Sequence, residues 1–421
     1  MKAQATLVKE VKEEPPSTTA TALQLEDEEP PGKAATALRR LFCNTPSENW
    51  NDWRWHFRNR ITTIEGLSKY VHFTPQERSR LRLVSIKYPL AITPYYLSLM
   101  NPDDPADPIR RQALPASEEL SMASAGMEDP LAEEEHSVVP GLVHRYPDRV
   151  LMVLTDICPM LCRHCTRKRE WRRGGWVRTP AQVEAMLEYI RNHKEVRDVI
   201  ISGGDPLTLS TQRLEAVLAG IRRIGHVEII RIGTRVPVVL PQRIDDELCN
   251  MLSKYSPIWL NTHFNHPREL TPEAAGACDR LLRAGVPVNN QSVLLKGVND
   301  SVETQLKLCQ GLLKIKVRPY YLFQCDDVAG TEHFWTSVET GVGIIQGMRG
   351  FTSGLAVPTY VIDLPNGGGK IPVQPDYILE SNEQELTVRN YQGKIIQYHN
   401  PGNAKQRFGQ IPLVCDGSIP V

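Results

Sequence analysis

The segment 155–170, TDICPMLCRHCTRKRE, follows an apolar run, RVLMVLTD (149–156), that is typical of a buried strand. It places Cys158, Cys162 and Cys165 at C-x3-C-x2-C spacing on one short loop. Three thiolates so spaced can bind three irons of a [4Fe–4S] cluster and leave the fourth iron open, whereas a closed structural metal site needs four protein ligands. A zinc loop completed by a distant fourth ligand, or buried thiols without a ligand, are the alternatives. The spacing favours the cluster, because zinc loops more often use paired C-x2-C.

Similar apolar runs recur along the chain and alternate with segments of helical periodicity. The runs that predict strands are 149–156, 198–205, 227–235, 258–264, 286–295, 317–326 and 357–365. The helices expected between them include 179–193, 210–224 and 270–285, which open with Ser or Thr capping residues. Repeated strand and helix units predict an α/β fold with a parallel sheet, either open or closed into a barrel. Sites in such folds form at the carboxyl ends of strands, where this chain has Asp156, Ser202, Gly203, Gly204, Asp205, His263, Gln291, Asp326 and Asp363.

The remaining segments suggest how the chain is divided. Residues 1–36 are rich in Glu, Pro, Thr and Ala, so we expect a disordered extension. Residues 37–148, aromatic from Trp50 onward, are expected to form an N-terminal helical region. The core domain is expected to span 149–371, and 372–421, which contains the alternating ELTVRNYQGKIIQY, to form a small β appendage.

The composition excludes several classes of protein. Lys+Arg and Asp+Glu both number 49, so a formal net charge of zero gives no reason to expect nucleic acid or an anionic membrane as partner. No apolar run reaches about 18 residues and no basic-then-apolar leader is present, so we expect a cytoplasmic protein without a membrane segment. Nine cysteines in such a chain favour metal or catalytic use over disulfides, because the cytosol is reducing.

The cysteine loop, together with SGGD (202–205) after the next predicted strand, resembles the radical S-adenosylmethionine (SAM) superfamily. The resemblance implies a partial, open parallel β/α barrel in which the three cysteines hold the cluster and SAM binds its open iron. One-electron reduction would then yield a 5′-deoxyadenosyl radical, so an electron donor such as flavodoxin or ferredoxin is an expected partner. The family segment that meets the methionyl amine is matched by Ser202, Gly203, Gly204 and Asp205. Alone, SGGD would predict only a tight turn.

A second motif, LPNGGGKIP (364–372), places Lys370 after three glycines. Glycines let the backbone approach a bulky ligand, and a lysine amine can form a Schiff base with an aldehyde cofactor. A phosphate-binding P-loop needs Ser or Thr after the lysine, where this chain has Ile371. A flexible surface loop with a solvated lysine is the remaining alternative.

An ordered set of segments from about Trp50 to about residue 398 resembles the lysine 2,3-aminomutase family. The set includes WNDWRW, AITPYYLSL, GLVHRYPDRVL, SGGDPL, VVLPQRI, NTHFNHP, NQSVLLKGVND, VRPYYLFQCD, MRGFTSG and GGGKIPV. The resemblance implies that Lys370 is a catalytic residue that carries pyridoxal 5′-phosphate (PLP), and that Arg145 and Arg149 help to hold this cofactor. Surface salt bridges are the alternative role for these arginines.

The same resemblance implies a substrate. Arg167 matches the arginine that binds the substrate carboxylate, and Asp326 and Asp363 match two aspartates that meet the side-chain ammonium of lysine. Two anions in an otherwise apolar pocket favour a cation and reject glutamate, whose aminomutases have non-acidic residues there. Arginine stays open as a substrate, because Asp327 stands where an apolar residue is expected. A cap or turn is the alternative role of each aspartate.

The chain is therefore expected to be an isomerase that interconverts L-lysine and L-β-lysine with a [4Fe–4S] cluster, SAM and PLP. An aminomutase of arginine or glutamate and a non-catalytic iron–sulfur protein are the alternatives. Gln291 and His263 are expected to contact SAM or to form core hydrogen bonds. Clostridial members of the family carry zinc, but here Ser301 follows GVND and the tail has only Cys415, so we predict no zinc. A homo-oligomer is expected from other contacts.

Overall fold

The computed structural model describes residue 42 and residues 44–400, except 122–124, 173 and 383. The expected disordered extension, 1–36, and the end of the expected appendage, 401–421, lie outside the described residues. Within the described residues, no helix is both long enough and apolar enough to cross a membrane.

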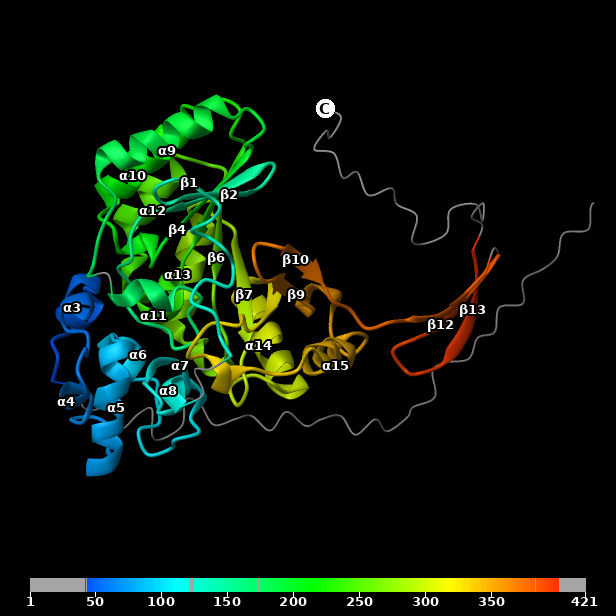
Figure 1. Cartoon of the computed structure of the whole chain (residues 1–421), viewed down its shortest axis with the longest axis horizontal. Helices are drawn as coiled ribbons and strands as arrows, with labels where there is room; N and C mark the ends of the chain where they lie inside the picture. The colour runs from blue at the N-terminus through cyan, green and yellow to red at the C-terminus, as the bar shows by residue number, and fades with distance from the viewer. Residues whose placement is uncertain (1–41, 43, 122–124, 173, 383, 401–421) are drawn as a thin grey trace, which may run out of the picture.

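The centre of the fold is a ten-stranded sheet whose strands lie in chain order from β1 to β10 (Figure 1). Its parallel part consists of β3 Arg149–Val153, β4 Asp198–Ser202, β5 Ile229–Gly233, β6 Ile258–Thr262, β7 Val288–Leu294, β8 Arg318–Gln324 and β9 Thr359–Leu364. The antiparallel edges are β1 Ser137–Val139, β2 Leu142–Tyr146 and β10 Gly369–Pro372. Every strand expected between 149 and 365 is therefore confirmed.

The sheet curves until its two edges approach each other. The backbone N–H of Lys370 on β10 donates to the hydroxyl of Tyr146 on β2 over 2.9 Å, although these strands are not neighbours in the sheet. No β1–β10 pairing closes the sheet among the described strands. The expected partial, open parallel β/α barrel is confirmed.

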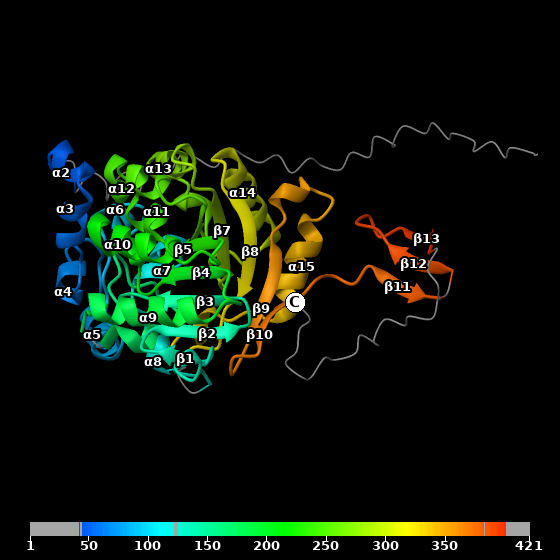
Figure 2. The same ribbon diagram turned by 90° about the horizontal axis from the view of Figure 1, so that it is seen from above.

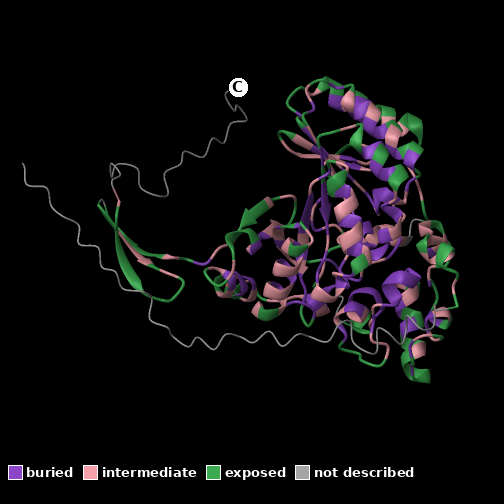
Figure 3. Ribbon diagram, turned by 180° about the vertical axis from the view of Figure 1, so that it is seen from behind, coloured by how far each residue is buried: buried purple, intermediate pink, exposed green. Residues whose placement is uncertain are grey.

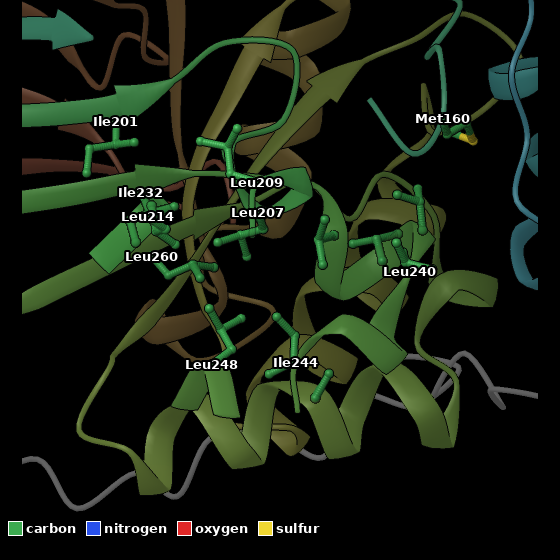
Figure 4. Close-up of a cluster of buried hydrophobic side chains, with 14 of the residues drawn as sticks. Met160, Ile201, Leu207, Leu209, Leu214, Ile232, Leu240, Ile244, Leu248 and Leu260 are labelled. Atoms are coloured by element: carbon green, nitrogen blue, oxygen red, sulfur yellow. The ribbon is translucent and has the colours of Figure 1, made fainter. Parts of the chain in front are cut away.

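Helices cover the outer face of the sheet (Figure 2). They are α9 Pro180–Asn192, α10 Thr211–Arg222, α12 Asp246–Ser253, α13 Pro272–Arg283, α14 Val302–Lys314 and α15 Val338–Met348. The three predicted helices begin at the expected hydroxyl caps, Thr179, Ser210 and Thr271, and α14 and α15 begin in the same way at Ser301 and Ser337. Ile201, Ile232 and Leu260 are fully buried on the strands and pack with Leu214 of α10 and Leu248 of α12 (Figure 4).

Short helices of the N-terminal part pack over the loops that follow the strands. They are α2 Ser47–Asn51, α3 Trp53–Arg58, α4 Ile64–Leu67, α5 Pro75–Lys87, α6 Pro94–Leu97, α7 Pro108–Ala113 and α8 Glu118–Ser121. The Tyr96 hydroxyl, for example, donates to Glu269 after β6 over 2.6 Å. The expected helical region 37–148 is thus helical only as far as α8. Its last part, LVHRY, folds back on β3 as an antiparallel hairpin and extends the sheet.

A small sheet of β11 Ile378–Ser381, β12 Glu385–Arg389 and β13 Ile395–His399 stands away from the body (Figures 1 and 2). It is mostly exposed, whereas burial is concentrated in the barrel (Figure 3). The expected β appendage is confirmed over these residues. Single 3-10 turns complete the fold: η1 Lys168–Arg172, η2 Pro206–Thr208, η3 Pro241–Arg243, η4 Pro267–Glu269, η5 Glu332–Phe334 and η6 Gly354–Ala356, with the short α11 Val236–Val239 after β5.

Candidate active site

The inner face of the sheet and the carboxyl ends of its strands enclose a cavity of about 540 Å³. Alternate strand residues, such as Leu151 and Ile200, face this cavity while their neighbours pack against the helices. All the site residues expected from the sequence line it: Arg145, Arg149, Cys158, Cys162, Cys165, Arg167, Ser202, Gly203, Gly204, Asp205, His263, Gln291, Asp326, Asp363 and Lys370. Residues far apart in the sequence are therefore brought to one place.

The three cysteines form one end of the cavity. All are free thiols, and burial raises the pKa of Cys158 well above its usual value, with a further contribution from Cys165. Burial likewise raises the pKa of Cys165, with Cys162 as the next cause. Thiols that oppose one another's ionisation need a cation to hold them as thiolates, so this set fits an iron cluster. In the described chain, no three or more His, Cys, Asp or Glu side chains surround a single-ion position.

Buried ion pairs fix the loop that carries these thiols. Arg163 donates to both carboxylate oxygens of Glu119 on α8, over 3.0 and 2.5 Å, and Lys168 donates to the same carboxylate over 2.8 Å. The three side chains are at most 1% exposed. Lys168 also donates to the carbonyl of Gly330, after β8, over 2.6 Å. The cysteine loop is thus tied both to the N-terminal helices and to the loop that follows Asp326.

The SGGD segment lies directly against the cysteine loop. Gly203 has a φ of +147°, and a Cβ atom there would meet the Thr155 carbonyl oxygen. A Cβ at Gly204 would lie 2.5 Å from the carbonyl carbon of Asp156. Only glycine allows this approach of the two backbones, so the motif is more than a tight turn.

Asp205 follows β4 and His263 follows β6, whereas Gln291, which was expected at a strand end, lies within β7. The Asp205 carboxylate accepts hydrogen bonds from the Thr234 hydroxyl over 2.7 Å and the Arg235 backbone N–H over 2.8 Å, which joins the loops after β4 and β5. Burial nevertheless raises the pKa of Asp205 to about 6. Burial and the charge of Arg235 lower the pKa of His263 to about 4, so this imidazole, hydrogen-bonded to the Gln291 backbone, is neutral at pH 7.

Lys370 and Asp363 form the opposite end of the cavity. They are directly paired residues of β10 and β9, so their side chains point to the same face. The Lys370 ammonium lies 2.7 Å from Asp363, and Arg145 donates to the other Asp363 oxygen over 3.4 Å. Lys370 therefore stands on an edge strand and not in the glycine loop in which the motif suggested it. Arg149 stacks its guanidinium on the Tyr146 ring at 4.3 Å.

Asp326 completes this end. Burial and, after it, the charge of the Asp363 carboxylate raise the pKa of Asp326 to about 7, against the opposing charge of Lys370. The two carboxylates thus line one cavity, and ionisation of Asp326 is unfavourable unless a cation binds beside it. Asp327, which had left arginine open as a substrate, is exposed and does not line the cavity.

Arg167 has an unexpected partner. Its Nε and Nη2 donate to the two oxygens of Glu133 over 2.8 and 2.6 Å, and its Nη1 donates to the Gly203 carbonyl over 2.9 Å. Burial raises the pKa of Glu133, but the charge and hydrogen bonds of Arg167, helped by Arg169, lower it to about 2. The arginine lines the cavity beside the cysteines, and its Nη1 also donates to the Ser202 hydroxyl over 3.3 Å.

Comparison with known proteins agrees with this geometry. A family profile described as "Radical SAM superfamily" matches residues 152–309, and one described as "Lysine-2,3-aminomutase" matches residues 345–417. The L-lysine 2,3-aminomutase of Clostridium subterminale is 53% identical over 86% of this chain and 87% of that protein. The chain belongs to the lysine 2,3-aminomutase family.

Two further members of this family show its range. The L-lysine 2,3-aminomutase of Bacillus subtilis (strain 168) is 50% identical over 86% of this chain and 77% of that protein. The glutamate 2,3-aminomutase of Clostridioides difficile is 44% identical over 84% of each chain. A radical SAM methyltransferase from Sphaerobacter thermophilus superposes with a TM-score of 0.39 and 19% identity over 53% of this chain and 68% of that chain. The radical SAM profile over residues 152–309 implies a [4Fe–4S] cluster and SAM for this aminomutase family member.

Two cavity residues escaped the sequence analysis. Glu133 lies in an acidic run, and such a run is normally a solvated surface, so nothing in the sequence marked it. Arg235 follows β5 at the carboxyl edge of the sheet, and the rule that selected His263 and Asp326 would also have selected it. In this aminomutase family member, both residues contact groups that the sequence did identify.

Proposed function

We propose that the protein interconverts L-lysine and L-β-lysine with a [4Fe–4S] cluster, SAM and PLP bound together in the cavity described above. The observation that carries the proposal is the acidic end of the cavity. There a primary ammonium, that of Lys370, lies 2.7 Å from Asp363, and a cation at this place also favours the charged form of Asp326. A site of this kind accepts lysine and rejects glutamate, because a third carboxylate would be buried beside two others.

The residues present also fit PLP. Lys370 offers a primary amine that points into the cavity, and two guanidinium groups, of Arg145 and Arg149, lie beside it on β2 and β3. Arginine is suited to phosphate, because its fork of donors matches the oxygens of that group. We assign Lys370 to the PLP aldehyde and the two arginines to holding the cofactor.

When bound, the cluster and SAM supply homolytic hydrogen transfer, and PLP supplies the π-system through which the amino group migrates. The residues of the protein hold the substrate in position. Arg167, fixed by Glu133, Gly203 and Ser202, is assigned to the α-carboxylate through the N–H that these partners leave free, while Asp326 and Asp363 hold the distal ammonium. Held at both ends, lysine can place its Cβ at only one depth in the cavity, which suppresses competing hydrogen loss. Ser202, Gly203 and Gly204 are assigned to the methionyl end of SAM, with Asp205 holding their loop, and His263 and Gln291 to its remainder.

The proposal is tested on anaerobically reconstituted full-length protein with SAM, PLP and dithionite. L-lysine, L-arginine and L-glutamate are supplied separately, and the β-amino acid products are identified by mass spectrometry. β-Lysine as the dominant product supports the proposal. Dominant β-arginine or β-glutamate would keep the chemistry and contradict the assignment of the two aspartates.

The physiological electron donor, a homo-oligomeric state, a cytoplasmic location and the absence of zinc stay predictions.

A further inference from the structure

Arg235 is a buried cation that none of the roles assigned above employs. It follows β5, and its residue is 7% exposed. Its Nη1 donates to the sulfur of Cys162 over 2.9 Å. Among the described side chains, no other guanidinium or ammonium group donates to the sulfur of one of the three cluster cysteines; the Cys165 sulfur accepts only the Arg167 backbone N–H, over 3.3 Å. Arg235 therefore singles out one of the three thiols.

The rest of the Arg235 guanidinium is held so that Nη1 cannot turn away. Its Nε donates to the His263 carbonyl over 3.0 Å, and its Nη2 donates to Gln112 over 2.5 Å and to Glu269 over 2.8 Å. These three partners thus aim one N–H of Arg235 at one sulfur. A donor held this firmly needs no rearrangement when the charge on the sulfur changes.

Glu269 does not cancel this cation completely, because its carboxylate is shared. It also accepts from the Tyr96 hydroxyl over 2.6 Å and from the backbone N–H groups of Asn265 and His266 over 2.6 and 3.0 Å. These donors draw part of the negative charge away from Arg235. The guanidinium keeps an electrostatic effect on the thiolate in a region of low dielectric.

We propose that Arg235 is a positioning residue for the cluster that raises its reduction potential through an N–H···S bond to Cys162. Hydrogen bonds and positive charge at ligand sulfurs favour the more negative, reduced cluster. The step concerned is addition of one electron from a low-potential donor, dithionite in the test below, to the oxidised cluster. The inference rests on the proposed cluster but not on the proposed substrate.

The test is an anaerobic redox titration of the reconstituted full-length protein, without SAM or amino acid, followed by the electron paramagnetic resonance signal of the reduced cluster. We compare Arg235→Met, Arg235→Lys, Glu269→Gln and the control Arg243→Lys. Arg243 is another buried arginine; it donates to the carbonyls of Leu207 and Leu209 and makes no hydrogen bond to a cluster cysteine. Iron and sulfide per chain are measured for each variant.

Arg235→Met is expected to lower the equilibrium constant for reduction at least tenfold, which is about 59 mV for a one-electron couple. Arg235→Lys keeps the positive charge but loses the branched guanidinium, so its reduction potential should lie between those of Arg235→Met and the wild type. Glu269→Gln shifts the potential the other way, and Arg243→Lys leaves it unchanged. If Arg235→Met does not bind iron, the inference is decided by the reduction potentials of Arg235→Lys, expected to be lower than wild type, and Glu269→Gln, expected to be higher. Unchanged potentials in Arg235→Lys and Glu269→Gln, with full iron, would overturn the inference, whereas absence of a cluster in the wild type would contradict the proposed site itself.

Discussion

The two ends of the cavity treat charge in opposite ways. At the cysteine end, cations are matched by buried carboxylates at short distances, as in Arg167 with Glu133 and Arg235 with Glu269. At the opposite end, Asp326 and Asp363 line the same cavity, and burial and the charge of Asp363 raise the pKa of Asp326 to about 7. One end is a closed network, whereas at the other Lys370 and Arg145 pair with Asp363 and Asp326 has no ion pair among the described residues.

The difference indicates what each end is for. A closed network of buried ion pairs is rigid, because each group would lose a charged partner if it moved. Such a frame suits cofactors that stay in place through many turnovers. The buried Asp326 carboxylate costs stability in its charged form until a cation arrives, so this end is suited to selecting a ligand. The comparison predicts that variants at the two ends will fail in different ways.

The largest effect is expected at the closed end, from the thiols themselves. Cys162→Ala should abolish aminomutase activity, because the cluster loses a ligand and with it the electron route to SAM. Iron per chain and the signal of the reduced cluster provide the measurement. Cys278→Ala, which removes a buried thiol from α13, serves as the control and should retain full iron. Wild-type iron and activity in Cys162→Ala would show that the loop does not hold the cluster.

The next effect is on stability. Glu119→Ala leaves Arg163 and Lys168 buried without their carboxylate and should lower the free energy of unfolding by about 3–5 kcal/mol. Denaturant unfolding of the reconstituted enzyme measures this loss. The neighbouring exposed Glu118→Ala should change it little. Equal stability of the two variants would mean that the closed network does not stabilise the cysteine loop.

Substitutions at the Asp326 and Asp363 end of the cavity should weaken lysine binding and leave the stability of the protein little changed. Asp363→Asn removes one partner of the substrate ammonium and should weaken lysine binding about 10- to 100-fold, as expected for a charged hydrogen bond. Lysine titrations of the PLP-loaded enzyme, followed by visible absorbance, report the dissociation constant. Asp327→Asn, an exposed neighbour of Asp326, should bind lysine as the wild type does. An unchanged dissociation constant in Asp363→Asn would remove this carboxylate from the pocket.

A smaller effect should appear in the pH dependence of binding. The pKa of Asp326 is about 7 in the free protein, and lysine favours its anion, so binding strengthens as pH rises through this value. Between pH 8 and pH 6 the ionised fraction falls from about 0.9 to about 0.1, so the apparent dissociation constant should rise about tenfold. Asp326→Asn should remove this component. The same pH dependence in variant and wild type would exclude Asp326 as its source.

Asp326, unlike Glu119, should lower the stability of the folded protein when it is ionised. Its folded-state pKa is raised above the value of about 4 expected in the unfolded chain. The folded state therefore binds the extra proton, and stability is lost as pH rises from about 4 to about 7. Asp326→Asn should thus unfold no more easily than the wild type at pH 8. Marked destabilisation there would mean that Asp326 belongs to the structural frame.

Local signals in the sequence predicted most of the fold, because strands, helix caps and glycine approaches depend on neighbouring residues. β3 to β9 and the caps at Thr179 and Ser210 are examples. The hairpin of β1 and β2 was missed, because short half-exposed strands have no clear alternation. Pairings between distant charges were missed for another reason. Nothing in the acidic run around Glu133 shows which of many arginines it meets, so the partner of Arg167 emerged only from the fold.

The central claim is that the acidic end of the cavity recognises a distal ammonium. The most direct test compares kcat/KM for L-lysine with that for L-norleucine, which has the same carbon chain but lacks the ε-amine, in the wild type and in the Asp326→Asn, Asp363→Asn double variant. Our account predicts that the wild type prefers lysine by about 10⁴-fold or more, and that the double variant loses most of this preference while it still turns over norleucine. Equal preference for lysine in both proteins would contradict it.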